Sequence, residues 1–398
     1  MNKLSTEREA VFDSFINIAR SIYSEDFIPL HRPIFYGNEK TYLSDCIDSN
    51  FVSSVGEYVN KFENLISEYV GSKFGIAIVN GTNAIHLGLL LLGVKPGEEV
   101  ITQSLTFVAT TNAIHYCNAD PVFLDVDRDT MGLSPKALKQ FLEHNCEQRK
   151  DGLYNKISGK KVSACISMHT FGLCGRIDEI VKVCKEFSLP VLEDAAESLG
   201  SFYKNKHSGT FGDIGVFSFN GNKLLTTGGG GMIVTNNAKL AKKAKHLSTT
   251  AKVPHAFEFN HDQVGYNYRM PNINAALGCA QIERIQVMLD SKKSVTKKYI
   301  EHFKHSDIEL VKPINSCVAN NWLNAIILNS KTDRDNFLTY TNNRNVMTRP
   351  IWKLTHSLPM NKNYFNDGLK NSFWLEERVV NIPSSVPINS FNKFIETF

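Results

Sequence analysis

The chain of 398 residues lacks a long apolar run, a Cys-x-x-Cys pair and an internal repeat. No apolar stretch approaches the ~20 residues needed to cross a bilayer, and the first ten residues lack the apolar core of a signal peptide. The eight cysteines are scattered, several of them in apolar or helical stretches, which is typical of reduced thiols. These absences predict a cytoplasmic protein without a membrane segment.

The sequence also has little net charge and no block of like charges. Its formal charge of +4 comes from 44 basic and 40 acidic residues spread along the chain. The densest basic stretch, residues 239–245, alternates lysines with apolar residues, which indicates the solvated face of a helix. A nucleic-acid partner is therefore not expected.

The length exceeds the roughly 250 to 300 residues at which a single hydrophobic core stops growing, so more than one domain is expected. We predict an N-terminal helical segment (1–30), a large domain (31–280) and a smaller C-terminal α+β domain (281–398). Apolar residues at helical spacing predict a helix over about residues 6–23 and a long one over about 272–305. The domain boundary is expected within that long helix.

The central part alternates short apolar runs with amphipathic stretches. Strands are predicted over residues 75–79, 99–102, 121–126, 163–168, 190–194, 216–219 and 231–235, with helices over 82–92, 108–117 and 177–187. Repeated βαβ units predict an α/β fold with a mostly parallel sheet and helices on both faces. Ligands of such sheets bind beyond the carboxyl ends of the strands.

A first candidate site follows the strand at 75–79. Asn80, Gly81, Thr82 and Asn83 open a helix, where free backbone N–H groups and a hydroxyl could bind a phosphate. The alternative is an ordinary N-cap turn in which Thr82 or Asn83 caps the helix.

A second candidate is the carboxylate pair that ends the strand at 190–194. Side chains alternate along a strand, so Glu193 and Asp194 point in opposite directions and only one faces a given site. A half-buried Asp194 is a suitable partner for a pyridinium nitrogen. The alternative is a structural carboxylate that caps the following segment.

The third candidate is Lys223, which lies between a short strand that carries Ser218 and the glycine run 228–231. A lysine in such a place is poorly solvated, which favours the neutral amine that forms imines. An ordinary lysine would be exposed and inert. The glycines show neither a Gly-x-Gly-x-x-Gly pattern nor the Lys-Ser/Thr ending of a phosphate loop, which argues against NAD and ATP sites.

These three elements, in this order, resemble the DegT/DnrJ/EryC1/StrS family of sugar aminotransferases over nearly the whole chain from about residue 28. The resemblance implies the fold type I of pyridoxal-phosphate (PLP) enzymes. It further implies that Lys223 carries PLP as a Schiff base and that Asp194 holds the ring nitrogen. The phosphate would lie against Gly81, Thr82, Asn83 and Ser218.

The resemblance assigns three further residues. Phe107 lies where the family places an aromatic residue that could cover the cofactor ring, although a core role fits it equally. Glu197 stands where many members have Gln or His near the cofactor's phenolic oxygen. Asn267 matches an asparagine that reaches the phosphate in the neighbouring subunit, which implies a homodimer with shared active sites.

Residues 50–56, 219–223 and 253–259 are similar to the legionaminic-pathway (LegC-type) branch of the family. That likeness implies amination at C4 of a UDP-linked 2-acetamido-4-keto-6-deoxy hexose, with glutamate as donor, in legionaminic acid or bacillosamine-type biosynthesis.

Two alternatives to an aminotransferase remain. Related sugar dehydratases have His in place of the catalytic lysine, and a catalytically silent subunit would only bind nucleotide sugars.

Other polar residues give weaker signals. His169, His207, His255 and His261 fall in predicted loops, but no pair shows metal-ligand spacing with a supporting acid, so no metal site is expected. His169 could approach the cofactor, although a structural role is favoured. Arg349 and His356 could meet a donor carboxylate or a diphosphate, and surface roles are favoured for both.

Overall fold

The structure is a computed structural model that describes residues 5–388. Residues 1–4 and 389–398, the outer ends of the predicted N-terminal segment and C-terminal domain, lie outside the described residues. The main sheet has nine strands: β1 (Phe74–Ile78), β2 (Glu99–Gln103), β3 (Asp120–Leu124), β4 (Cys146–Arg149), β5 (Gly152–Asn155), β6 (Lys161–Met168), β7 (Val191–Asp194), β10 (Ile214–Ser218) and β11 (Gly231–Thr235).

The main sheet is mostly parallel, as the sequence predicts. Its main path runs β1-β11-β10-β7-β6-β2-β3, with β4 and β5 attached as a hairpin beside β6. The strands β10, β7, β6, β2 and β3 are parallel, whereas β11 is antiparallel to both β10 and β1. Because β1 and β10 share this antiparallel neighbour, their carboxyl ends reach the same edge as those of β6 and β7.

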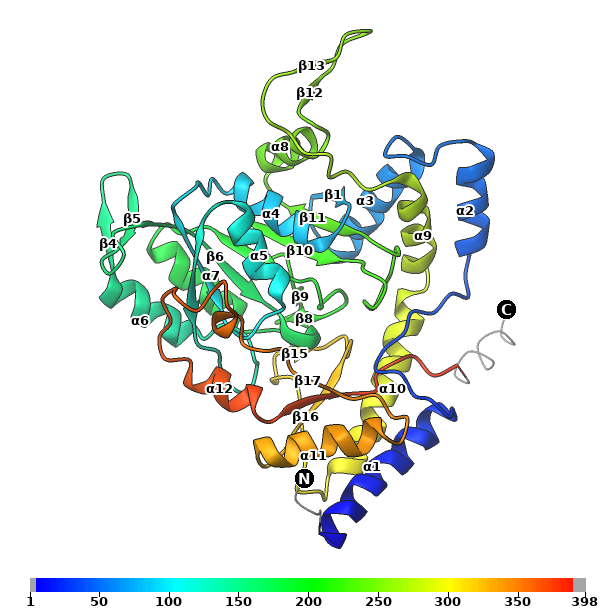
Figure 1. Ribbon diagram of the computed structural model, residues 1–398. Coiled ribbons are helices and arrows are strands. Elements are labelled where there is room, and N and C mark those ends of the chain that lie inside the picture. The colour runs from blue at the N-terminus through cyan, green and yellow to red at the C-terminus, as the bar shows by residue number, and fades with distance from the viewer. Residues whose placement is uncertain (1–4, 389–398) are drawn as a thin grey trace.

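Helices cover both faces of this sheet (Figure 1). One face holds α4 (Gly81–Leu91), α5 (Val108–Tyr116) and α8 (Ala238–Ser248). The other holds α3 (Glu57–Val70), α6 (Pro135–Asn145), α7 (Ile177–Glu186) and α9 (Asn272–Ile282), with α2 (Glu39–Asp48) packed on α9. Strand alternation produces the two cores: Ile76 and Ile78 of β1 pack towards α4, and Ala77 packs towards α3.

A second, smaller sheet lies in the C-terminal part. It has the antiparallel order β14 (Glu309–Leu310), β16 (Asn324–Ile327), β18 (Val379–Ile382), β17 (Arg349–Pro350). The helices of this part are α10 (Ile285–Phe303), α11 (Lys331–Asn342) and α12 (Lys370–Glu376). Helix α1 (Thr6–Tyr23) joins the same core, because its Phe12 and Phe15 pack with Tyr299 and Phe337.

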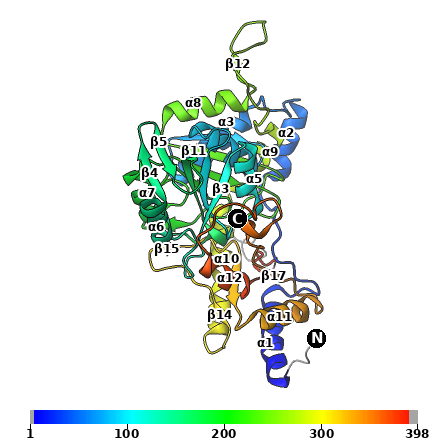
Figure 2. The ribbon, with the colours of Figure 1, turned by 60° about the vertical axis from the view of Figure 1, so that its left-hand side comes forward.

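Two small β elements complete the fold. β8 (Phe202–Tyr203), β9 (Lys206–His207) and β15 (Cys317–Val318) form a three-stranded sheet that links the two parts of the chain. β12 (Lys252–Val253) and β13 (Asn260–His261) form a hairpin that projects from the body in both ribbon views (Figures 1 and 2). Phe257, Phe259 and Val264 around it are 81%, 78% and 81% exposed.

The single helix predicted over about residues 272–305 is wrong, because the chain forms two helices there. α9 ends with Glu283 as its cap, Arg284 leaves the helical conformation, and α10 begins at Ile285. The break is held from outside: Tyr36 donates a hydrogen bond to the Arg284 carbonyl (3.3 Å), and Tyr42 donates one to the Glu283 carboxylate (2.7 Å). Side chains from residues 36 and 42 thus contact the chain where the two helices meet.

No helix within residues 5–388 combines the length and the apolar character that a membrane crossing requires.

Candidate active site

A pocket of about 300 Å³ lies at the sheet edge where β6, β7 and β10 end. Seven of the nine residues predicted to bind a cofactor line it, namely Gly81, Thr82, Phe107, Asp194, Glu197, Ser218 and Lys223. A wider hollow of about 600 Å³ near Asp45 and Lys61 contains none of the nine. The predicted site residues therefore lie together in the smaller pocket, at the carboxyl ends of the parallel strands, where ligands of such sheets bind.

Lys223 points into this pocket from a turn after β10. Its backbone N–H donates to Asn220 O (2.9 Å), and its Nζ lies 3.1 Å from Glu197 Oε1. The other oxygen of Glu197 accepts from the Phe171 N–H (2.8 Å). Burial raises the pKa of Glu197, and the nearby Lys223 charge opposes that shift. The Lys223 amine therefore lies against the Glu197 carboxylate where both side chains are largely buried.

Asp194 is 3% exposed at the end of β7. Its Oδ2 accepts from the Thr110 hydroxyl (2.7 Å) and its Oδ1 from the Ala196 N–H (3.2 Å). Burial raises the pKa of Asp194 above its usual value, although these hydrogen bonds favour the carboxylate. Within residues 5–388 no cation forms an ion pair with it, since Lys223 pairs with Glu197. A positively charged ring nitrogen would supply the missing partner.

Glu193 points to the opposite side, as strand alternation predicts. Its carboxylate accepts from the backbone N–H groups of Gly209, Phe211 and Gly212 at 2.5–2.8 Å and pairs with His169 Nε2 at 2.9 Å. The Gly175 N–H donates to the other ring nitrogen of His169 (3.3 Å). His169 is thus a fully satisfied structural histidine, which was the favoured interpretation.

The turn between β1 and α4 forms the third wall. Asn80 caps α4, accepting from the Asn83 N–H (2.8 Å), so the expectation that Thr82 or Asn83 would be the cap is wrong. A Cβ on Gly81 would lie 2.9 Å from Ser218 Cβ, so only glycine lets the helix start so close to β10. The resulting cradle of N–H groups and two hydroxyls fits a phosphate.

Two predicted cofactor residues do not line the pocket. Asn83 lies one position further along α4, half-buried, with its N–H engaged by Asn80. Asn267 is exposed on the segment that follows the projecting hairpin, where it bridges to Thr249. Its assignment to a neighbouring subunit stays a prediction.

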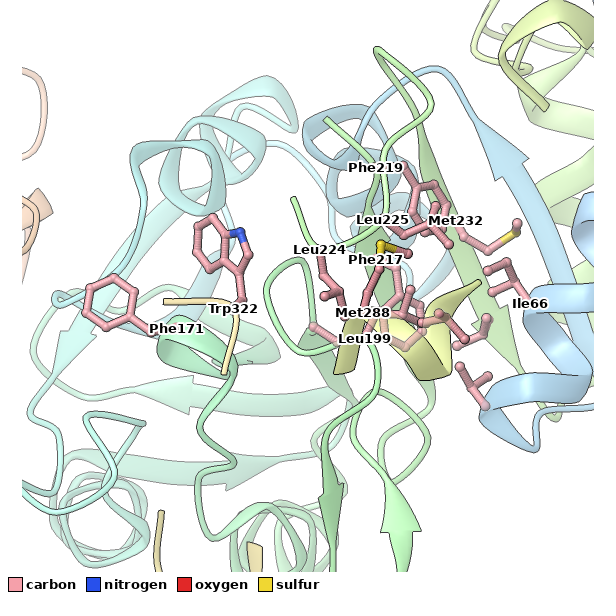
Figure 3. Close-up of a cluster of buried hydrophobic side chains, with 14 of the residues drawn as sticks. Ile66, Phe171, Leu199, Phe217, Phe219, Leu224, Leu225, Met232, Met288 and Trp322 are labelled. Carbon is pink, nitrogen blue, oxygen red and sulfur yellow. The ribbon is translucent and has the colours of Figure 1, made fainter. Parts of the chain in front are cut away.

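Aromatic side chains close the site. Phe107, 49% exposed at the rim, packs edge-on against Trp352 with ring centroids 6.3 Å apart, so it is not a core residue. Trp322 is 4% exposed, and Lys223 Nζ lies 4.0 Å from its ring centroid. The sequence interpretation missed both tryptophans, and it missed the role of Thr110. Trp322 and Phe171 stand apart from the other labelled side chains of the core in Figure 3.

The remaining candidates lie elsewhere. His207 is buried and accepts from the Gly200 N–H (2.8 Å), whereas His255 and His261 are exposed near the hairpin. Arg349 is exposed, and His356 is hydrogen-bonded with Ser104 (2.8 Å) outside the pocket. Residues 5–388 contain no group of three or more His, Cys, Asp or Glu side chains that could hold a metal ion.

Comparisons with known proteins agree with this geometry. A family model described as the DegT/DnrJ/EryC1/StrS aminotransferase family matches residues 34–391. A Bacillus subtilis (strain 168) protein named as the pyridoxal phosphate-dependent aminotransferase EpsN is 40% identical over 334 residues, 84% of this chain and 83% of its own. The GDP-perosamine synthase of Escherichia coli O157:H7 is 36% identical over 334 residues, 84% of this chain and 87% of its own.

Among solved structures, the aminotransferase PseC of Helicobacter pylori, involved in pseudoaminic acid biosynthesis, has a TM-score of 0.83. It is 22% identical and covers 94% of this chain and 100% of its own, so it supports the fold alone. The structure and the family match together confirm the expected fold type I and its cofactor. This chain belongs to the DegT/DnrJ/EryC1/StrS family of pyridoxal-phosphate-dependent sugar aminotransferases.

Proposed function

We propose that this protein moves an amino group from glutamate to C4 of a UDP-linked 2-acetamido-4-keto-6-deoxy hexose, in legionaminic acid or bacillosamine-type biosynthesis. The observation that supports the chemistry best is the Lys223 amine, 3.1 Å from Glu197, in the same pocket as a buried Asp194 that has no cation partner within residues 5–388. The sugar and the pathway follow from the resemblance of residues 50–56, 219–223 and 253–259.

The pocket residues have distinct proposed roles towards PLP. Lys223 would hold it covalently, Asp194 would keep its ring nitrogen protonated, and the turn at Gly81 and Thr82 with Ser218 would bind its phosphate. When bound, PLP withdraws electrons from the carbon attached to the transferred nitrogen.

Residues of this chain would carry out the proton transfers of the reaction. The Lys223 amine would move a proton from the donor's α-carbon to the cofactor in the first half-reaction, and from the cofactor to the sugar carbon in the second. Glu197 would hold the positive charge on the Lys223 amine while the amine carries each proton, and the buried Trp322 would exclude water from the amine. Lys223 also favours transamination over the dehydratase alternative, which needs His at this position, and over a silent subunit, which needs a missing catalytic group.

A GDP-linked amino sugar is the second candidate product. Three relatives named GDP-perosamine synthase, which are 34–36% identical to this chain, favour it.

We further propose a homodimer, in which Asn267 contacts the cofactor of the neighbouring subunit. We also propose a cytoplasmic location, which is supported by eight buried cysteines without a disulfide.

The test is the visible absorption of the purified protein with PLP, beside its Lys223→Ala variant and, as a matched control, a variant at the exposed Lys239 (Lys239→Ala). We expect a band in the wild type and in Lys239→Ala only. Glutamate should bleach the band, and the correct keto sugar should restore it. Parallel additions of UDP- and GDP-linked 4-keto-6-deoxy sugars separate the two candidates. Absence of a band in the wild type with excess PLP contradicts the proposal.

A further inference from the structure

Lys292 is a buried lysine outside the cofactor pocket. It lies on α10, is 1% exposed, and donates hydrogen bonds only to carbonyl oxygens, those of Trp322 (3.1 Å), Asn321 (3.5 Å) and Ser384 (2.5 Å). Within the described part of the chain it has no carboxylate partner, and burial lowers its pKa to about 7. Burial of an amino group costs free energy, and here carbonyl oxygens, not a carboxylate, offset that cost.

The carbonyls that Lys292 binds belong to the loop that carries Trp322 to the active site. The Trp322 ring lies 4.0 Å from Lys223 Nζ, and its Nε1 donates to the Asn222 carbonyl (2.8 Å), directly before Lys223. In the same loop, Asn320 donates to the Glu197 carbonyl (2.8 Å). The loop therefore contacts both members of the Lys223–Glu197 pair.

The third carbonyl anchors this arrangement in the C-terminal part. The Ser384 backbone N–H donates to Leu30 O (2.7 Å), and its hydroxyl accepts from the Asn324 N–H (2.8 Å). One ammonium group thus joins α10, the Trp322 loop and the segment after β18. Without it, the buried carbonyls of Trp322 and Ser384 and the half-buried carbonyl of Asn321 would lose a donor, and the loop would lose one of its links to the C-terminal part.

Another buried side chain lies beside Trp322. The His31 ring centroid is 6.3 Å from the indole, and its Nδ1 is buried without a hydrogen-bond partner in residues 5–388. Burial, together with the charges of Lys292 and Lys223, lowers the pKa of His31 well below its usual value. His31 is therefore neutral at physiological pH and brings no charge that competes with Lys292.

We propose that Lys292 is a positioning residue for the reaction at Lys223: it holds the Trp322 loop so that the indole stays against the Lys223 amine. This rests on the proposed function of Lys223. With PLP and substrate bound, the Lys223 amine would be free to move protons and would have to stay aimed at the reacting carbon, and the indole face would confine it there. Lys292 acts through Trp322 and does not itself touch the substrate.

The test compares the full-length holoenzyme with Lys292→Met, which keeps the length but removes the donors, and with Lys293→Met, its exposed neighbour on α10. In Lys292→Met we expect kcat to fall on the order of tenfold, with KM for glutamate changed by less than about twofold. The pH midpoint of the PLP absorption band should also move, which a loss of global stability would not produce. Lys293→Met should match the wild type in all three measurements.

The outcomes separate this inference from the proposed function. A wild type without the band defeats the proposed function itself. A normal wild type beside a Lys292→Met variant with unchanged kcat and band, or with only a lower Tm, overturns the role of Lys292. If Lys292→Met does not fold, Trp322→Phe tests the same proposal. In Trp322→Phe, a changed band and a lower kcat support a positioning role that acts through the indole, and wild-type values of both overturn it.

Discussion

At the scale of single residues, Asp194 has opposite effects on stability and on activity. Burial raises its pKa, so its stabilising contribution is fully present below the ordinary pKa of aspartate and is lost as pH rises through the raised value. In the cofactor-free protein no cation within residues 5–388 pairs with this carboxyl group, so its ionised form stays unfavourable. Such sites trade stability for function.

We predict that Asp194→Asn stabilises the cofactor-free protein, at pH values above the raised pKa of Asp194, by on the order of 1 kcal/mol, because it removes the buried charge. The gain should shrink as pH falls. With PLP bound, Asp194→Asn should instead lower the stability, and kcat should fall on the order of 10²-fold, because no carboxylate then favours the protonated ring nitrogen. Thermal melts with and without PLP measure the two changes in stability, and steady-state kinetics measure kcat, with the exposed Asp262→Asn as control. A loss of stability in both states would contradict this account.

Asp194 and Lys223 were predicted as site residues from the sequence, and both line the pocket. Asp194 and Lys223 each end a recognisable strand or turn, so their positions followed from local pattern. Thr110 binds Asp194, and Trp322 and Trp352 line the pocket, but none of the three could be found that way, because each is brought there by tertiary packing. Trp322 lies 99 positions after Lys223 in the chain, and no local spacing relates the two.

At the scale of elements, the close approach of α4 to β10 builds the proposed phosphate cradle. Gly81 starts α4, and its missing Cβ leaves room for Ser218. In Gly81→Ala the new Cβ would lie 2.9 Å from Ser218 Cβ, and such overpacking costs typically about 1–3 kcal/mol. The helix must then move away from the strand that completes the cradle.

Gly81→Ala is therefore expected to weaken PLP binding by about tenfold or more, measured by titration of the cofactor-free protein. Gly229→Ala is the matched control, since a Cβ there would have its nearest neighbour at 3.9 Å. Equal PLP affinity in Gly81→Ala and the wild type would show that the cradle tolerates the added methyl group.

Helices and strands could be predicted where the hydrophobic period was strong. The predictions failed where tertiary contacts determine strand pairing or the end of a helix. The runs at 75–79 and 231–235 were recognised as strands, and β1 and β11 lie there. The antiparallel pairing of β1 with β11 was not visible, because pairing depends on contacts between distant segments. The break between α9 and α10 was also missed, because side chains from residues 36 and 42 hold it.

At the scale of the whole molecule, one chain leaves apolar side chains of a projecting segment uncovered. The hairpin β12–β13 projects from the body (Figure 2), and Phe257 and Phe259 are 81% and 78% exposed there. Exposed apolar side chains that lie close together are typical of interaction sites. Asn267 follows the hairpin and is exposed, away from the pocket of its own chain. Both observations favour an active site completed by a second copy.

Complementation between two inactive variants tests that arrangement. In a mixed dimer of Lys223→Ala and Asn267→Ala, a shared site would combine the intact Lys223 of one chain with the intact Asn267 of the other. After subunit exchange, about a quarter of wild-type activity is expected, because half of the dimers are mixed and each contains one intact site. Mixing Lys223→Ala with Glu197→Ala is the control: both residues line the same pocket of one chain, so neither mixed site is intact. Recovery in the first mixture but not in the second requires Asn267 to act across the interface. Equal failure of both would assign Asn267 to its own chain and leave the hairpin without a part in the active site.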